Sequence, residues 1–148
     1  MTLRQTAPHA PRILVIDDDE IVLQAIRDLL TSAGYYAHCL VSPIGATQVI
    51  VSQQIQAVVV DLNMPVMRGD RFISLLRSWD RIRDLPTVLI SGAATATLEE
   101  IAKQLPGVGV VSKDSMQRTL PEILQRMLAR GRNGPPTGSR PGLGAPRK

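Results

Sequence analysis

The sequence predicts an α/β protein in which a doubly wound, five-stranded parallel sheet is covered by helices on both faces. Three observations support this fold class: five short apolar runs, helix-period patterns between them, and turn or capping residues at the junctions. Regular alternation of strands and helices indicates parallel crossover units. Strands that are apolar without interruption are typical of a parallel sheet buried on both faces.

The predicted strands occupy residues 13–16, 35–40, 57–60, 87–90 and 108–111. Each run is far shorter than the roughly 20 apolar residues that a membrane-spanning helix needs. The N-terminal segment MTLRQTAPHAPR has no apolar core of the kind that a signal peptide carries. We therefore expect no membrane association.

Helical patterns separate the strands. The first covers residues 19–33, and Gly34 suits its C-terminal end. Ser42 followed by Pro43 predicts a cap and a first-turn proline that open the second helix. The third covers residues 70–79 and is predicted to turn four apolar side chains inward, namely Phe72, Leu75, Leu76 and Trp79.

Two further helices are predicted from possible capping boxes, in which a Ser or Thr precedes a Glu by three residues. Thr97 with Glu100 predicts the start of the fourth helix, and Thr119 with Glu122 that of the fifth. This organisation predicts a loose N-terminal arm over residues 1–11, a domain over 12–130 and a disordered basic tail over 131–148. The tail has nine Gly or Pro among 18 residues.

Composition limits the function classes. The net charge is +4, but residues 12–130 carry 12 basic and 13 acidic residues, so the surplus lies in the arm and tail. With an aromatic content of 3%, few side chains could stack on bases. We expect no direct nucleic-acid partner. Cys39 is the single cysteine, which excludes an internal disulfide and fits a core position in a cytoplasmic protein.

Polar side chains follow four of the predicted strands. Asp17, Asp18 and Asp19 follow the first, Asp61 the third, Ser91 the fourth, and Lys113 lies near the end of the fifth; these are the candidate functional residues. Ligands of open parallel sheets gather beyond the carboxyl ends of the strands. We therefore expect these side chains to converge on one edge of the sheet.

The convergence predicts a phosphoryl-transfer site. Two carboxylates about 4 Å apart repel each other by roughly 1–4 kcal/mol, and a divalent cation removes that repulsion. Clustered carboxylate oxygens suit Mg²⁺, which shares its coordination sphere with phosphate. Asp61 is then the candidate nucleophile, while Ser91 and Lys113 can contact phosphoryl oxygens. No cluster of His and Cys is present, so zinc is not expected.

Four segments carry a family resemblance. They are ILVIDDDEIV, the loop DLNMPVMRG over residues 61–69, PTVLISGA and VVSK. In sequence and spacing they resemble the receiver domains of bacterial two-component response regulators, and the resemblance spans about residues 12–130. It implies a flavodoxin-like receiver fold with strand order 2-1-3-4-5. It also implies that Asp61 is the phosphoacceptor.

The resemblance further implies a ligand set for Mg²⁺. Asp18, Asp61 and the backbone carbonyl of Asn63 would bind the ion directly, and Asp17 through water. Ser91 would sense the phosphoryl group.

Lys113 would contact the phosphoryl group as well, while Asn63 and Ala93 would tune its hydrolysis. The implied partners are a histidine kinase or histidine phosphotransfer protein and a downstream protein target. The expected role is a stand-alone switch without an output domain, a regulator rather than an enzyme, and a monomer or weak dimer.

The sequence departs from the family at two positions of the fifth strand and its loop. Val110 stands where an aromatic residue is usual, and Asp114 stands where proline is usual after the lysine. A valine cannot swing inward as a ring does, so the output coupling is expected to differ. Asp114 also brings a carboxylate beside Lys113 and could compete for it.

Three alternative functions remain open from sequence. A receiver-like scaffold could bind a partner without phosphorylation, which Val110 and Asp114 favour. A small phosphatase of the haloacid-dehalogenase type would use Asp17 and Asp19 as its Asp-x-Asp motif. A flavodoxin-like FMN protein is disfavoured, because three Asp residues after the first strand would repel phosphate.

Overall fold

A computed structural model gives the fold and describes residues 10–132. The strands are β1 (Arg12–Ile16), β2 (Tyr36–Leu40), β3 (Ala57–Asp61), β4 (Thr87–Ser91) and β5 (Gly109–Ser112). The helices are α1 (Glu20–Ser32), α2 (Ala46–Ser52), α3 (Gly69–Arg77), α4 (Thr95–Gln104) and α5 (Met116–Arg132). Strands and helices alternate along the described chain, as predicted.

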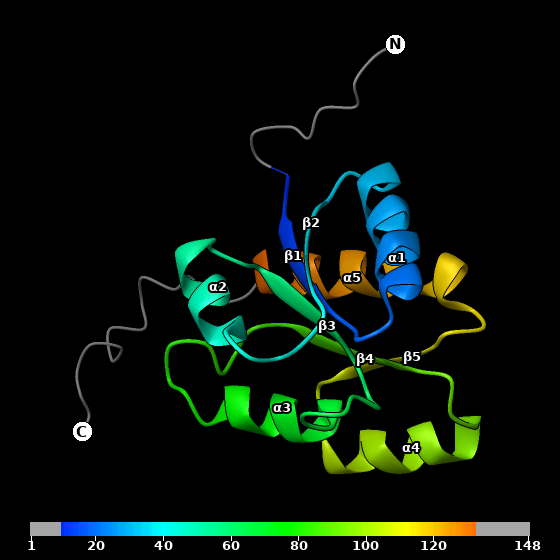
Figure 1. Ribbon diagram of the computed structural model, residues 1–148. Helices are drawn as coiled ribbons and strands as arrows, with labels where there is room; N and C mark the ends of the chain where they lie inside the picture. Colours follow the sequence, from blue (N-terminus) through cyan, green and yellow to red (C-terminus); the bar gives the residue numbers. More distant parts are fainter. Residues whose placement is uncertain (1–9, 133–148) are drawn as a thin grey trace.

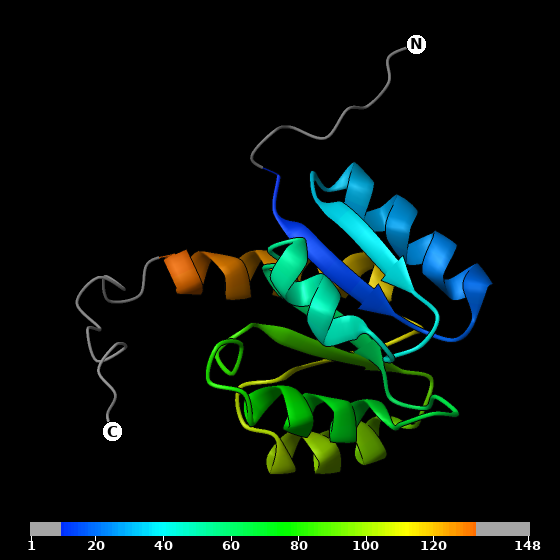
Figure 2. The same ribbon diagram turned by 60° about the vertical axis from the view of Figure 1, so that its left-hand side comes forward.

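The strands form one parallel sheet in the order β2-β1-β3-β4-β5, which confirms the predicted order. In β3 and β4, Val58 pairs with Thr87 and Asp61 with Ile90. The carboxyl ends of β1, β3, β4 and β5 therefore meet at one edge. Figures 1 and 2 show the sheet in the middle, with α1 on one side and α3 and α4 on the other.

Alternating strand residues supply two apolar cores, one on each face of the sheet. One core joins inward residues of α2, α3 and α4 to Leu14, Val58 and Leu89. The other joins α1 and α5 to Ile13 and Val59. Successive side chains of a strand point to opposite faces, so a continuous apolar run is needed to fill both cores.

Three predicted helix starts are wrong, because the helices begin at other residues. The Ser42 Oγ accepts from the N–H of Ile44 at 3.1 Å. Helix α2 begins only after Gly45, whose left-handed φ of 83° does not belong to a right-handed helix. Helix α4 already begins at Thr95, so Thr97 lies inside it. The hydroxyl of Thr119 donates to the carbonyl of Ser115 at 2.9 Å within the first turn of α5.

The inward face of α3 is narrower than predicted. Phe72 and Leu76 are buried, but Leu75 is 42% and Trp79 46% exposed. The helix ends at Arg77, and the Ser78 hydroxyl donates to the carbonyl of Leu75 at 2.6 Å. Trp79 therefore lies in the loop after the helix, with a partly exposed side chain.

The predicted arm and tail lie largely outside the described residues, and their limits stay predictions. At the N-terminal side, the carbonyl of Pro11 accepts from the N–H of Tyr36 at 2.9 Å. At the other end, α5 continues through Arg132. None of the helices in the described range 10–132 combines the length and apolar character needed to traverse a lipid bilayer.

Candidate phosphoacceptor site

The three aspartates in the turn after β1 differ in burial and in their hydrogen bonds. Asp17 is fully buried, and its backbone N–H donates to the carbonyl of Leu40 at 3.1 Å, which continues the sheet ladder beyond the strand. Its Oδ1 accepts from the N–H of Asp19 at 2.9 Å. Asp19 in turn caps α1 by accepting from the N–H of Ile21 at 2.9 Å. The backbone geometry of this turn therefore holds the Asp17 side chain in place and leaves that of Asp18 exposed. The Asp19 side chain caps α1.

Asp61 closes β3 and is 4% exposed. Two backbone hydrogen bonds hold the loop after it close to the sheet. The N–H of Leu62 donates to the carbonyl of Ile90 at 2.9 Å, and the N–H of Gly69 donates to the carbonyl of Leu62 at 2.8 Å. A side chain at Gly69 would collide with the backbone carbonyl of Asp61 and come within 3.0 Å of Leu89. Glycine at this position therefore lets α3 begin directly against the backbone of Asp61.

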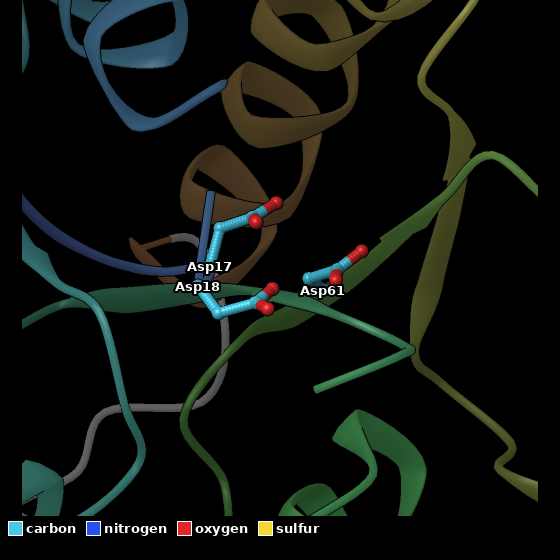
Figure 3. Close-up of side chains that lie close together, drawn as sticks. All are labelled: Asp17, Asp18 and Asp61. Atoms are coloured by element: carbon cyan, nitrogen blue, oxygen red, sulfur yellow. The ribbon is translucent and has the colours of Figure 1, made fainter. Parts of the chain in front are cut away.

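The three carboxylates of Asp17, Asp18 and Asp61 form a cluster, each offering an oxygen within 4.8 Å of the others. Figure 3 shows these three side chains projecting together from the ends of β1 and β3. Lys113, from the turn after β5, completes the group. Its Nζ lies 3.0 Å from Oδ2 of Asp17 and 3.1 Å from Oδ1 of Asp61.

The charges of this cluster act on each other at close range. Burial raises the pKa of Asp61; the contact with Lys113 lowers it, Asp17 and Asp18 raise it again, and the net shift is upward. For Lys113, burial lowers the pKa, but hydrogen bonding and attraction to Asp17 and Asp61 outweigh it, and the net shift is upward. Without a further cation, the site therefore holds more negative charge than one ammonium group neutralises.

One carboxylate oxygen fits a metal site. Oδ2 of Asp17 is fully buried and faces the Lys113 ammonium at 3.0 Å. A carboxylate oxygen with one cationic neighbour keeps a lone pair for a further ligand. The donor set consists of carboxylate oxygens and can be completed by water, which suits Mg²⁺. The residues present therefore fit the predicted ion.

Ser91 and Asn63 lie at the same edge as the cluster. Ser91 is buried on β4, one residue beyond the pairing partner of Asp61, and its Oγ accepts from the N–H of Ala93 at 2.9 Å. Asn63 lies two residues after Asp61 with an exposed side chain, and Ala93 is half-buried. The structure thus gathers the predicted residues at one edge, while their roles toward a ligand stay predictions.

The two departures on the β5 side have distinct outcomes. Val110 is half-buried in β5. Lys113 forms its ion pairs with Asp17 and Asp61, and within residues 10–132 no such pair joins it to Asp114, so the expected competition is not observed. The N–H of Asp114 donates to the hydroxyl of Ser112 at 3.2 Å. No cis peptide bond occurs in the described chain, so the bond after Lys113 is trans.

The phosphatase alternative does not fit this geometry. Its motif needs Asp17 and Asp19 in one site, but the carboxylate of Asp19 caps α1 and lies outside the cluster of Asp17, Asp18 and Asp61. Asp61, which that alternative leaves unused, is part of the group.

Sequence comparison identifies the family. The sequence model of the response regulator receiver domain matches residues 13–125. Among curated proteins, the transcriptional regulatory protein PrrA of Mycobacterium bovis is 27% identical over 125 residues. That alignment covers 84% of this chain and 50% of PrrA, so the chain spans about half the length of this relative.

Solved structures share the fold. A sensor protein from Polaromonas sp. JS666 is 28% identical with a TM-score of 0.74, over 81% of this chain and 97% of that one. The receiver domain of the sensor histidine kinase PA1611 from Pseudomonas aeruginosa is 23% identical with a TM-score of 0.71, over 81% and 98%. That structure has a magnesium ion coordinated in its active-site cleft. Together with the family match, the strand order and the acidic edge place this chain in the response regulator receiver domain family.

Proposed function

We propose that the chain is a phosphoacceptor switch of a two-component phosphorelay and that Asp61 receives the phosphoryl group. Receiver domains are in general regulators rather than enzymes. The observation that carries the proposal is the position of Lys113, whose ammonium lies within 3.1 Å of both Asp17 and Asp61. A cation at this point is placed to contact an anionic group held between the carboxylates.

The proposed reaction moves one phosphoryl group. An Oδ atom of Asp61 forms a bond to phosphorus while the bond from phosphorus to a histidine nitrogen of the donor breaks. The electron pair of that bond returns to the imidazole, and the product on Asp61 is an acyl phosphate. Water later attacks phosphorus, which releases inorganic phosphate and restores the carboxylate. The chain thus resets itself.

The chain's own residues position these groups. Asp18, Asp61 and the Asn63 carbonyl would hold Mg²⁺ directly, and Asp17 through water; the bound ion neutralises charge on the phosphoryl oxygens. Lys113 offers a compact charge to one phosphoryl oxygen.

The Ser91 hydroxyl would donate to another phosphoryl oxygen. It now accepts a hydrogen bond from Ala93, which leaves its own hydrogen available for donation. Asn63 and Ala93 flank the position of the attacking water and would set the lifetime of the acyl phosphate.

The proposed partners follow from this chemistry. A histidine kinase or a histidine phosphotransfer protein would supply the phosphoryl group in the cytoplasm, and a downstream protein would read the phosphorylated form. We expect this exchange through protein–protein contacts of a monomer or weak dimer. Action without an output domain stays a prediction.

Intact mass spectrometry after incubation with acetyl phosphate and Mg²⁺ tests the proposal. The wild-type chain is expected to gain the mass of one phosphoryl group, and the gain should disappear in EDTA. Asp61→Asn should show no gain, whereas the control Asp28→Asn, on the exposed side of α1, should behave as wild type. A phosphoryl group that persists in Asp61→Asn would contradict the site assignment.

A second candidate function is a receiver-like scaffold that binds its partner without phosphorylation. Val110 favours it, because an aliphatic side chain on β5 cannot report the phosphorylated state by rotation of a ring. The same mass measurement separates the two functions. A chain that binds Mg²⁺ yet takes up no phosphoryl group from either acetyl phosphate or a phosphorylated histidine donor would support the scaffold.

A further inference from the structure

A second polar hollow lies at the opposite edge of the sheet from Asp61. It has a volume of about 560 Å³ and is lined by the end of α3, the loop before β4, the turn before β5 and the last turns of α5. Figure 2 shows the C-terminal end of α5 and the loop between α3 and β4 on the same side, away from the loops that follow β1 and β3. The volume falls in the range of small-molecule sites, roughly 300–1,000 Å³.

Three arginines from different segments line this hollow: Arg77, Arg83 and Arg130. Asp84 is the single carboxylate among its described lining residues, so the lining carries a surplus of positive charge. This contrasts with the near balance of 12 basic and 13 acidic residues over the whole of 12–130. A concave surface lined by one sign of charge concentrates the field of that charge.

The guanidinium of Arg77 is held in position by the backbone. Its Nη2 donates to the carbonyl of Pro106 at 2.6 Å. Gly107 lies beside the same nitrogen, and its φ of +86° favours glycine in this turn. The remaining N–H groups of a guanidinium fixed in this way can bind an anion at a lower entropic cost than those of a free side chain.

The other two arginines keep their charge available. Arg83 lies 3.6 Å from Asp80, but both side chains are exposed, and such pairs are weak. Arg130 forms no ion pair with any residue of the described range 10–132. An incoming anion therefore need not displace a strong internal partner.

The rest of the lining is partly apolar. Leu85, Pro86 and Met127 contribute to it, and all three are half-buried. Apolar side chains beside guanidinium groups suit a ligand with an anionic end and a flat ring, because methionine adapts to rings and guanidinium planes stack on them. A purely inorganic anion would leave this part of the surface unused.

We propose that this hollow binds a phosphate-bearing small molecule of mononucleotide size. The three arginines contact its phosphate oxygens, and Leu85, Pro86 and Met127 contact its ring. The site needs no metal and shares no residue with the acidic cluster, so this proposal and the phosphoacceptor function can fail separately.

Calorimetric titration of the full chain with AMP and ADP in EDTA tests the proposal. EDTA prevents a nucleotide from bridging through Mg²⁺ to the carboxylates of the other edge. We expect saturable binding with one ligand per chain that weakens as salt is added. Adenosine, which lacks phosphate, should bind at least roughly tenfold more weakly, as expected when charged hydrogen bonds are lost.

Matched arginine variants locate the site. Arg130→Gln and Arg83→Gln should each weaken binding roughly tenfold, whereas Arg126→Gln, one turn before Arg130 on α5 and outside the lining, should leave it unchanged. The circular dichroism spectrum and the urea denaturation midpoint check that each variant is folded. Arg77→Gln adds to the test where both match the wild type.

Three outcomes would overturn the proposal. The first is absence of saturable nucleotide binding up to millimolar concentration. The second is an equal loss in Arg126→Gln, which would indicate unspecific attraction to basic surface. The third is preferential binding of a glutamate-rich peptide over AMP and ADP, which would indicate a docking surface for an acidic protein.

Discussion

The two edges of the sheet carry opposite charges and differ in how those charges are held. At the carboxyl edge, Asp17 and Asp61 are buried and depend on a lysine that lies 3.0 and 3.1 Å away. At the amino edge, arginines line an open hollow, and the ion pair between Arg83 and Asp80 is exposed. Buried charges couple strongly to folding and to each other, and exposed charges do so weakly. Substitutions at the first edge should therefore affect stability, and those at the second should affect binding alone.

The largest effect is expected from Gly69→Ala. The added methyl group would collide with the carbonyl of Asp61, so α3 must move away from β3. We expect a loss of about 1–3 kcal/mol in the free energy of unfolding, measured by urea denaturation, together with slower phosphoryl uptake. Gly92→Ala is the stability control, because a Cβ at Gly92 meets no atom within 4 Å. Equal stability of both variants would show that the backbone contact at position 69 is not tight.

Lys113→Met should have the next largest effect, because it removes the cation between two buried carboxylates. We expect the free energy of unfolding in EDTA, measured by urea denaturation, to fall by about 2 kcal/mol. Part of this loss should be recovered in Mg²⁺. Lys103→Met, at an exposed position of α4, should change little in either buffer. A loss at position 113 that Mg²⁺ does not reduce would argue against a shared acidic site.

Asp61→Asn should stabilise the metal-free protein at neutral pH. The pKa of Asp61 is raised in the folded state, so its ionised form favours unfolding. The stability that protonated Asp61 contributes is fully present below its pKa in the unfolded chain. It is lost as the pH rises through its pKa in the folded protein. Removing one of three clustered carboxylates should therefore raise the free energy of unfolding by about 1 kcal/mol at pH 7 in EDTA.

The gain should shrink as pH falls through the folded pKa, because wild-type Asp61 is then protonated. Urea denaturation of both proteins across the acid range measures this trend. A gain that grows toward acid pH would show that the sign of the pKa shift is opposite.

The smallest effect is expected from Arg83→Gln at the amino edge. Its ion pair with Asp80 joins two exposed side chains, so the free energy of unfolding should change by less than about 0.5 kcal/mol. Phosphoryl uptake at Asp61 should stay at the wild-type rate. A destabilisation comparable to that of Lys113→Met would remove the distinction between the two edges.

Much of the carboxyl edge could be predicted from the sequence. The short apolar runs located the end of each strand, and a parallel sheet brings these ends together, so the grouping of Asp17, Asp18, Asp61 and Lys113 followed from topology. Sequence alone does not show which of the three consecutive aspartates caps the helix, because they differ only in backbone geometry; in the structure Asp19 is the cap. The tight approach of Gly69 needs coordinates, since the glycine alone does not show what lies beside it.

Other features of the structure were harder to predict from the sequence. The capping motifs at Thr97 and Thr119 are local patterns, and in the folded chain both helices begin earlier. Trp79 was expected to face inward because helical periodicity was extended past Arg77, where the helix ends. The arginine-lined hollow could not be predicted, because its residues come from segments far apart that share no periodicity.

The fit of the buried Asp17 carboxylate to a metal ion has a consequence for handling the protein. An ion that binds only the folded chain increases the free energy of unfolding by mass action, by roughly 1.4 kcal/mol when its free concentration is ten times its dissociation constant. We expect chelating buffers to lower the melting temperature and speed proteolysis. The available magnesium would then contribute to the lifetime of this protein as well as to its proposed chemistry.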